Sequence, residues 1–185
     1  TVNGIVSGTG GIVKNGAGTL VLATSNSYTG ATTNNAGMIS GKGCASSAHT
    51  IMAGTVSPGG NSAQGIYQTA NLEMKAGSRY NYDLATTPTE YINVNGNLTL
   101  PAAANSVTIS VNGTSHKGDH YKFFNVSGTM PTYSQVTNAL CITPPIGGGS
   151  WQIGSGSIDW MWPYLVRITN ISGAVTVKTA TQYIA

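Results

Sequence analysis

The residues that could do chemistry are few in this chain, and the carboxylates are the first candidates. The five are Glu73, Asp83, Glu90, Asp119 and Asp159. Enzymes that act on polysaccharides place carboxylates in pairs for acid and base catalysis or for binding calcium. Only Asp83 and Glu90 flank one short loop (85–89), and no Asp-x-Asp pair is present. We therefore expect two solvated loop carboxylates rather than a catalytic pair.

Histidine spacing is the next candidate for chemistry. His116 and His120 lie four residues apart with Asp119 between them, a spacing that would face a metal ion from a helix. Gly118 and the strand-like run after it favour a surface loop, so we expect no metal site, with adventitious metal binding as the alternative. His49 stands alone, and we expect it to be structural. No motif of a hydrolase, zinc protease or nucleotide-binding loop is present. We expect no catalytic residue, no cofactor and no enzymatic activity.

Cys44 and Cys141 are the two cysteines of the chain. One interpretation is two free thiols. The other is a disulfide, which would close a loop of about 100 residues and stabilise the fold by about 4–5 kcal/mol. In a fold of stacked layers about 4.8 Å apart, residues so distant in sequence lie several layers apart, whereas a disulfide needs Cα atoms within about 7 Å. A stacked fold therefore argues against the disulfide.

The composition points to an extracellular β-protein. Charged residues make up 7% of the chain, against roughly 25% in an average protein. Glycine, threonine, serine and asparagine together supply 83 of the 185 residues, yet 40% hydrophobic residues and a net charge of +3 are not the signature of disorder. The eight basic residues are scattered, so we expect no nucleic-acid partner. No apolar run is long enough for a membrane helix. The chain opens without a signal peptide, so we expect a fragment or mature portion of an exported protein.

The elements that must position these residues are short strands. Apolar and polar residues alternate with period two in several runs, which predicts half-buried strands. The clearest runs are 72–75, 79–84, 91–94, 97–100 and 107–111. Asn-Gly, Gly-Gly and Asn-Asn pairs between the runs predict turns. The nearest approach to a helical period is 134–140, which is long enough for two turns.

A glycine followed by a strand recurs through the first third of the chain. The units at 18–22, 37–40 and 54–57 are about 17 to 19 residues apart, and 71–74 and 97–100 repeat the pattern at a longer interval. Self-similarity with a period near 20 residues predicts a solenoid, in which each coil buries its inward side chains by stacking on its neighbours. Ladders of threonine, serine and asparagine suit such stacking, because stacked charges would repel.

Residues 8–39 resemble the passenger-associated transport repeat of bacterial autotransporters. The matching residues are Gly8, Gly10, Gly11, Lys14, Gly16, Gly18, Thr19, Leu20, Leu22, Asn26, Tyr28, Thr29, Gly30, Thr32, Ala36 and Gly37. Ala31 departs from the pattern, where glycine is common. Weaker likeness to passengers extends over 4–128 and loosely over 129–185. The glycine spacing reports architecture rather than activity.

The resemblance implies an all-β fold, a right-handed parallel β-helix exported through the outer membrane and found at the cell surface or secreted. We predict about five or six coils of the passenger stalk over 1–105 and an irregular β cap with autochaperone-like character over 106–185. The expected function is a non-enzymatic stalk that supports folding and translocation. Its expected partners are its own outer-membrane β-barrel translocator and an N-terminal passenger region, both outside this chain, with host-surface or self-association partners as further options. The alternative is an adhesin or polysaccharide-acting fragment that binds glycans through a lateral groove.

Large aromatic residues gather near the C-terminus. Alternation places Trp160, Trp162 and Tyr164 on one face of a strand that Pro163 confines to an edge. Together with Trp151 they predict a hydrophobic cap over the last coil, which an open solenoid end requires. The alternative is a platform for sugars or a partner. A closing hairpin is expected over 164–168 and 173–178, and we expect folding to begin at this end.

Overall fold

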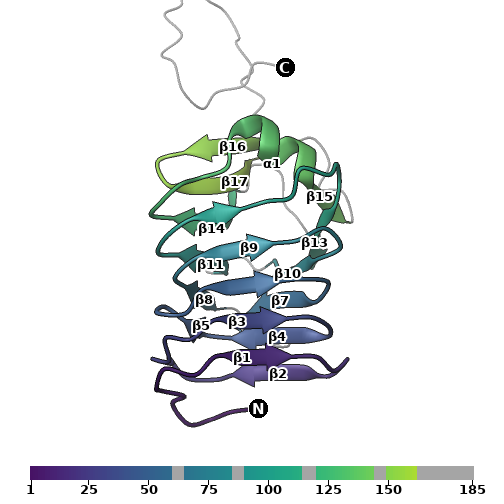
Figure 1. The fold of residues 1–185 in the computed structure, drawn as a ribbon. Helices are drawn as coiled ribbons and strands as arrows, with labels where there is room; N and C mark the ends of the chain where they lie inside the picture. Colours follow the sequence, from purple (N-terminus) through teal and green to yellow (C-terminus); the bar gives the residue numbers. More distant parts are fainter. Residues whose placement is uncertain (60–64, 85–89, 114–119, 144–148, 162–185) are drawn as a thin grey trace, which may run out of the picture.

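The computed structural model describes residues 1–59, 65–84, 90–113, 120–143 and 149–161. The chain winds as a column of stacked coils, and each full coil contributes one strand to each of three sheets (Figure 1). The first sheet contains β1 (Ile12–Lys14), β3 (Thr32–Asn34), β6 (His49–Ile51), β9 (Leu72–Met74) and β12 (Leu98–Thr99). The fold is a parallel β-helix, as the sequence predicts.

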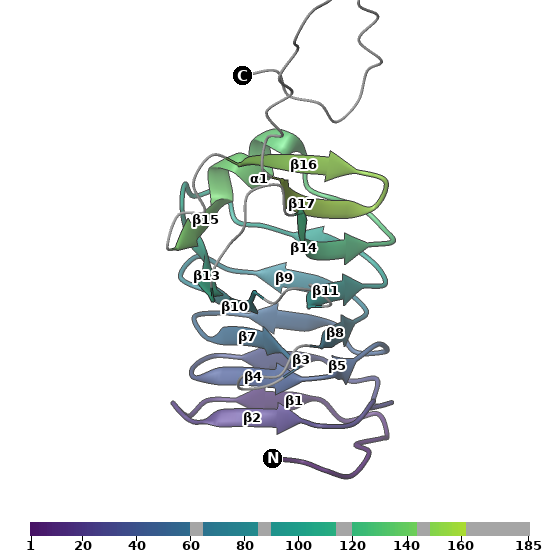
Figure 2. The ribbon, with the colours of Figure 1, turned by 180° about the vertical axis from the view of Figure 1, so that it is seen from behind.

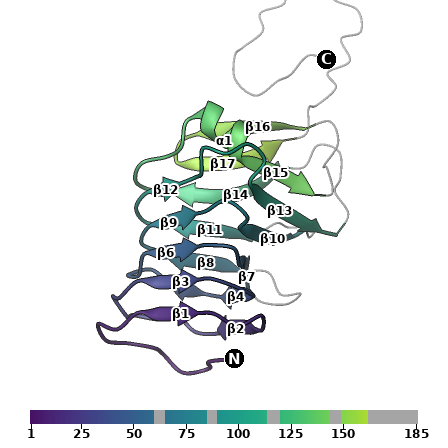
Figure 3. The ribbon, with the colours of Figure 1, turned by 45° about the vertical axis from the view of Figure 1, so that its right-hand side comes forward.

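The other two sheets form the remaining walls of the column (Figures 2 and 3). The second sheet contains β2 (Thr19–Leu22), β4 (Met38–Gly41), β7 (Thr55–Pro58), β10 (Arg79–Asp83), β13 (Val107–Asn112) and β15 (Leu140–Thr143). The third contains β5 (Gly43–Cys44), β8 (Ile66–Thr69), β11 (Tyr91–Val94), β14 (His120–Val126), β17 (Ser157–Met161) and β16 (Ser150–Gly154). Among the described strands, pairing is parallel except for β14 with β17 and β17 with β16.

The register shows why the glycine-strand units recur. Thr19 pairs with Met38 and Met38 with Thr55, so the three early units lie directly on one another in the second sheet. The later units stack as well, since Leu72 pairs with Leu98, but they do so in the first sheet. Units that look alike in sequence therefore occupy different walls. The sheet to which a unit belongs depends on the number of residues in the corners between the strands.

The column continues past residue 105 with parallel strands. β13 pairs with β10, β14 with β11 and β15 with β13. The helix α1 (Tyr133–Ala139) then precedes β15, at the point in the coil where a first-sheet strand would stand. It begins with a capping box between Thr132 and Gln135, and it confirms the two turns expected near 134–140. The division of the chain at residue 105 into two units stays a prediction.

Antiparallel strands β16 and β17 and the helix α1 end the described column, at the opposite end from β1 and β2 (Figure 1). The core runs along the inside of the coils as a single cluster of buried side chains. Aliphatic residues such as Ile39, Ile51 and Val56 fill the early coils, whereas large rings fill the later ones. In the part of the chain that the structure describes, no helix is long and apolar enough to span a lipid bilayer.

Candidate functional site

The repeat over residues 8–39 forms close-packed corners between successive coils. A Cβ atom added at Gly30 would lie 2.4 Å from the backbone of Gly10 and Gly11, and one added at Gly11 would lie 2.3 Å from the carbonyl oxygen of Ala31. Two backbones touch here, so both positions require glycine. Gly37 has a φ of 70° and would bring a side chain 2.4 Å from the Gly18 oxygen. These glycines allow the backbones of successive coils to touch at the corners.

Lys14 joins two corners by hydrogen bonds to backbone carbonyl groups. Its ammonium group donates to the carbonyl oxygen of Ala36 (2.8 Å) and to that of Gly16. A side chain at Gly37 would also come within 2.6 Å of the Lys14 nitrogen. The cation thus satisfies carbonyl groups of two successive coils, which explains a lysine in a segment that otherwise has no charge.

Asn26 connects three coils with one side-chain amide. Its Oδ1 accepts from the Val6 N–H group (2.9 Å), and its Nδ2 donates to the carbonyl oxygens of Thr24 (2.8 Å) and Gly43 (2.9 Å). The side chain is almost fully buried. Because each buried backbone group needs a partner, this amide stands in for strand pairing at a corner where the sheet is interrupted.

Tyr28 and its neighbours form a buried polar network within the same coils. The Tyr28 hydroxyl is 2.7 Å from the Thr32 hydroxyl, which is 3.1 Å from that of Ser47. Burial raises the pKa of Tyr28 above its ordinary value, and the hydrogen bond with Thr32 opposes the rise. The remaining repeat residues have plainer roles: the Gly8 oxygen accepts from the Thr29 N–H group (2.9 Å), and Leu20 packs against the core.

His49 is buried next to this network, as expected of a structural residue. A hydrogen bond of 2.9 Å joins its Nδ1 to the Tyr67 hydroxyl, and the two rings meet edge to face. Burial lowers the pKa of His49 to about 3, so the imidazole is neutral at ordinary pH. Its Nε2 has no hydrogen-bond partner within the described residues.

The C-terminal end of the core is built from aromatic rings. Phe123 lies at its centre, 4.8 Å from Tyr82 and 5.7 Å from Trp151 between ring centroids. Trp151 meets Trp160 at 5.1 Å across the antiparallel pair β16–β17, and both are partly buried. Trp162, Tyr164 and the hairpin expected over 164–168 and 173–178 lie outside the described residues. The capping role of these residues stays a prediction.

One of the five carboxylates is not where the sequence suggests. Glu90 is only 1% exposed, so its assignment as a solvated loop residue is wrong. Its Oε1 accepts from the backbone N–H of Asp83 (3.2 Å), while its Oε2 has no partner within the described chain. Burial raises the pKa of Glu90 to about 9, the Asp83 hydrogen bond opposes the rise, and the Asp83 charge adds to it. Asp83 is not a loop residue either, because it ends strand β10 and is half-buried. Its carboxylate accepts from Asn112 (2.9 Å).

The phase of the strand alternation was the signal for this burial. Glu90 precedes β11 in step with Ile92 and Val94, and all three side chains point into the core.

Of the remaining candidate metal ligands, His120 and Asp159 lie close together. His120 Nε2 is 3.2 Å from Asp159 Oδ2, which also accepts from the Ser157 hydroxyl (2.6 Å). His116 and Asp119 lie outside the described residues. No group of three metal-binding side chains occurs in the described ranges. Cys44 and Cys141 are both free thiols, and Cys44 donates to the Tyr28 carbonyl oxygen (3.1 Å).

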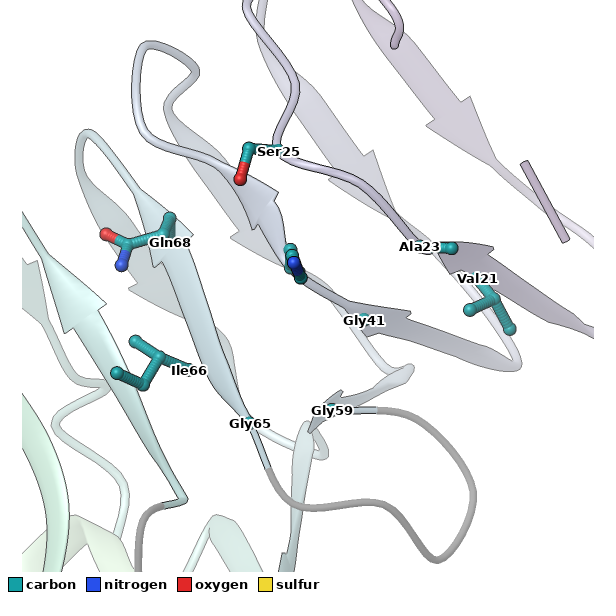
Figure 4. Close-up of a pocket in the computed structure, with 9 residues that line it drawn as sticks. Val21, Ala23, Ser25, Gly41, Gly59, Gly65, Ile66 and Gln68 are labelled. Carbon is teal, nitrogen blue, oxygen red and sulfur yellow. The ribbon is translucent and has the colours of Figure 1, made fainter. Parts of the chain in front are cut away.

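A lateral groove lies where the second and third sheets meet, with a volume of about 510 Å³ (Figure 4). Its walls carry three apolar side chains, Val21, Ala23 and Ile66, and three polar ones, Ser25, Lys42 and Gln68. A smaller hollow of about 260 Å³ adjoins it and shares the same three polar residues. Among the described residues, the lining contains no carboxylate and no aromatic ring, and no motif in the sequence pointed to it.

Comparison with protein families confirms the interpretation of the repeat. Residues 12–39 match the passenger-associated-transport-repeat, a repeat of autotransporter passengers. The matched segment is the part of the column that runs from β1 into β4, including Lys14, Asn26, Tyr28, Gly30 and Gly37. A search of curated proteins found no match, and neither did a search of solved structures. The chain therefore carries an autotransporter passenger repeat within a parallel β-helix.

Proposed function

We propose that this chain is a non-enzymatic stalk of an autotransporter passenger, which supports folding and outer-membrane translocation and carries an N-terminal functional region at the cell surface. One observation carries the proposal: the side chains of the matched repeat bind the backbones of neighbouring coils. The polar groups of Lys14 and Asn26 form hydrogen bonds with backbone carbonyl and N–H groups of the column. Side chains used in this way support the column, which favours a structural role.

A stacked column suits export of an unfolded chain. The first coil is costly, because non-local pairing must precede any gain from stacking. Once one coil exists, each further coil docks on a prepared edge. The aromatic cluster around Phe123 is the best candidate for that first stable unit, because each ring can bury about 150–250 Å². Folding would then proceed from the C-terminal end towards Thr1 and draw the chain outward.

Export by living cells tests the stalk. Phe123→Ala in the parent passenger should lower the amount displayed at the surface several-fold, measured by accessibility of an N-terminal epitope to added protease. Tyr133→Ala is the matched control, because it also removes a ring, but one that is 58% exposed. Normal display of the Phe123 variant would contradict a role for this region in export.

Limited proteolysis tests the direction of folding. At intermediate protease concentration, a fragment of roughly residues 100–185 should survive while the first coils are digested. Replacing Trp151 and Trp160 together by alanine should remove that protection, because the two rings pack on one another and on the core. Survival of an N-terminal fragment instead would place the stable unit at the other end.

The non-enzymatic character has its own test. Incubation of the chain with a panel of glycans should yield neither new reducing ends nor unsaturated products. Turnover of any glycan would overturn this part of the proposal and leave the architectural part standing.

A further inference from the structure

An aligned row of side-chain amides runs along the outer face of the third sheet. Gln68, Asn93 and Asn125 pair in register on β8, β11 and β14. Asn125 Nδ2 donates to Asn93 Oδ1 (2.6 Å), and Asn93 Nδ2 donates to Gln68 Oε1 (2.8 Å). Asn125 and Asn93 both donate towards the N-terminal coils, and Asn93 Nδ2 also donates to Asn95 Oδ1 (2.8 Å), just past the end of its own strand. The two bonds along the row share one direction, so they polarise one another. Gln68 is the last of the row.

The donor end of this row opens into the lateral groove. Gln68 Oε1 is occupied by Asn93, while its Nε2 has no partner in the described part of the chain. Gln68 lines the groove together with Lys42, which is exposed and forms no ion pair with any described residue. The groove therefore combines a free ammonium group with a polarised N–H donor, and its described lining holds no carboxylate to neutralise them. This combination favours an anion that accepts hydrogen bonds.

The other walls limit the kind of anion. Val21, Ala23 and Ile66 give the groove apolar sides, and Ser25 adds a hydroxyl group (Figure 4). A volume of about 510 Å³ is that of a site for a small molecule. The ligand thus needs an apolar face as well as a negative charge and hydroxyl groups.

An acidic peptide fits this site less well than a sugar. Peptides that lie along sheets gain affinity from unpaired backbone groups, but the backbone here is already engaged. The Gln68 N–H group donates to the Lys42 oxygen (2.9 Å), and the Lys42 N–H group donates to the Leu22 oxygen (2.8 Å). These two strand N–H groups are therefore not free for a peptide, and the contacts proposed for a ligand are made by side chains. A sugar ring presents C–H groups to apolar walls and hydroxyl groups to polar ones.

We propose that the groove between the second and third sheets binds a carboxylated saccharide, with the carboxylate held by Lys42 Nζ and Gln68 Nε2. The sugar ring lies against Ile66 and Val21, and the adjoining hollow over Ser25 accommodates a neighbouring sugar. This binding site is separate from the stalk function and does not depend on it.

Calorimetric titration of the 185-residue chain with a uronic acid trisaccharide tests the proposal. Saturable binding that weakens with added salt is expected, together with no binding of a neutral trisaccharide of the same length. Lys42→Met keeps the aliphatic stem and removes the charge, and it should weaken binding about tenfold or more. Gln68→Glu keeps the acceptor for Asn93 and replaces the free donor with a negative charge, so it should weaken binding at least as much.

Lys75→Met is the matched control, because it changes the net charge equally but removes a lysine that pairs with Glu73 beside the first sheet. It should leave the affinity unchanged. Circular dichroism of each variant checks that the fold is retained. The proposal is overturned by no saturable binding, by equal binding of the neutral sugar, or by equal losses in the Lys42 and Lys75 variants. Equally tight binding of a tetraglutamate peptide would also overturn it.

Discussion

The early and late coils of the column are held together by different forces. In the coils of residues 12–58, buried polar side chains such as Asn26 bind backbone groups of neighbouring coils. In the coils of residues 79–161, rings such as Tyr82 and Phe123 pack edge to face in the interior. Directional hydrogen bonds specify register, whereas the area that a ring buries supplies most of the stabilising free energy. In this column, the early coils therefore contribute mainly to correct register and the late coils mainly to stability.

The largest test of this comparison removes the central ring of the late coils. Phe123→Ala should lower the free energy of unfolding by about 3–5 kcal/mol, because a buried ring leaves a cavity that its neighbours cannot fill. Urea denaturation followed by tryptophan fluorescence measures the loss. Tyr133→Ala, at an exposed ring, should change stability by less than about 0.5 kcal/mol. Equal losses in the two variants would show that the aromatic cluster is not the stabilising unit.

The two regions should also respond to pH in opposite directions. Glu90 has its folded pKa raised to about 9 from 4.5, so the folded state binds a proton that the unfolded state has lost. Its contribution is fully present below pH 4.5 and is lost as the pH rises towards 9. His49 has its folded pKa lowered to about 3 from 6.5. Its contribution is present above pH 6.5 and is lost as the pH falls towards 3.

The sum is a stability profile that is flat between about pH 4.5 and 6.5 and falls on both sides. Glu90→Gln should remove the alkaline fall, and at pH 7 it should raise the free energy of unfolding by about 3 kcal/mol. Urea denaturation at a series of pH values measures the profile. An alkaline fall that persists unchanged in the variant would mean that Glu90 is not the group responsible.

A smaller effect is expected from the polar connection of the early coils. Asn26→Ala should cost about 2 kcal/mol, because it leaves the Val6 N–H and Gly43 carbonyl groups without their partner. Hydrogen exchange should show the loss at the first coils before the later ones. The bond from Asn35 to Asn15 is exposed, and Asn35→Ala should cost no more than about 0.5 kcal/mol. If the two variants cost the same, the buried amide has no special role.

Much of the architecture follows from local sequence. Period-two alternation, dense turn pairs and the recurrence of glycine before a strand were sufficient to predict a parallel solenoid. The early units stack in the predicted order because they are separated by nearly constant numbers of residues, as the pairs of Thr19 with Met38 and of Met38 with Thr55 show. The repeat motif could also be recognised from the sequence, because close contact between coils admits only glycine at Gly11 and Gly30.

The stacking of the coils determines the burial of side chains near the corners, which local sequence patterns do not specify. Whether a side chain near a corner faces the core depends on where the coil turns, and that depends on neighbours many residues away. Lys42 is exposed for this reason, in the corner between β4 and β5. The groove beside Lys42 and Gln68 exists only because three coils bring residues 21–68 together. Contacts between coils join residues that are distant in sequence, so no local pattern records them.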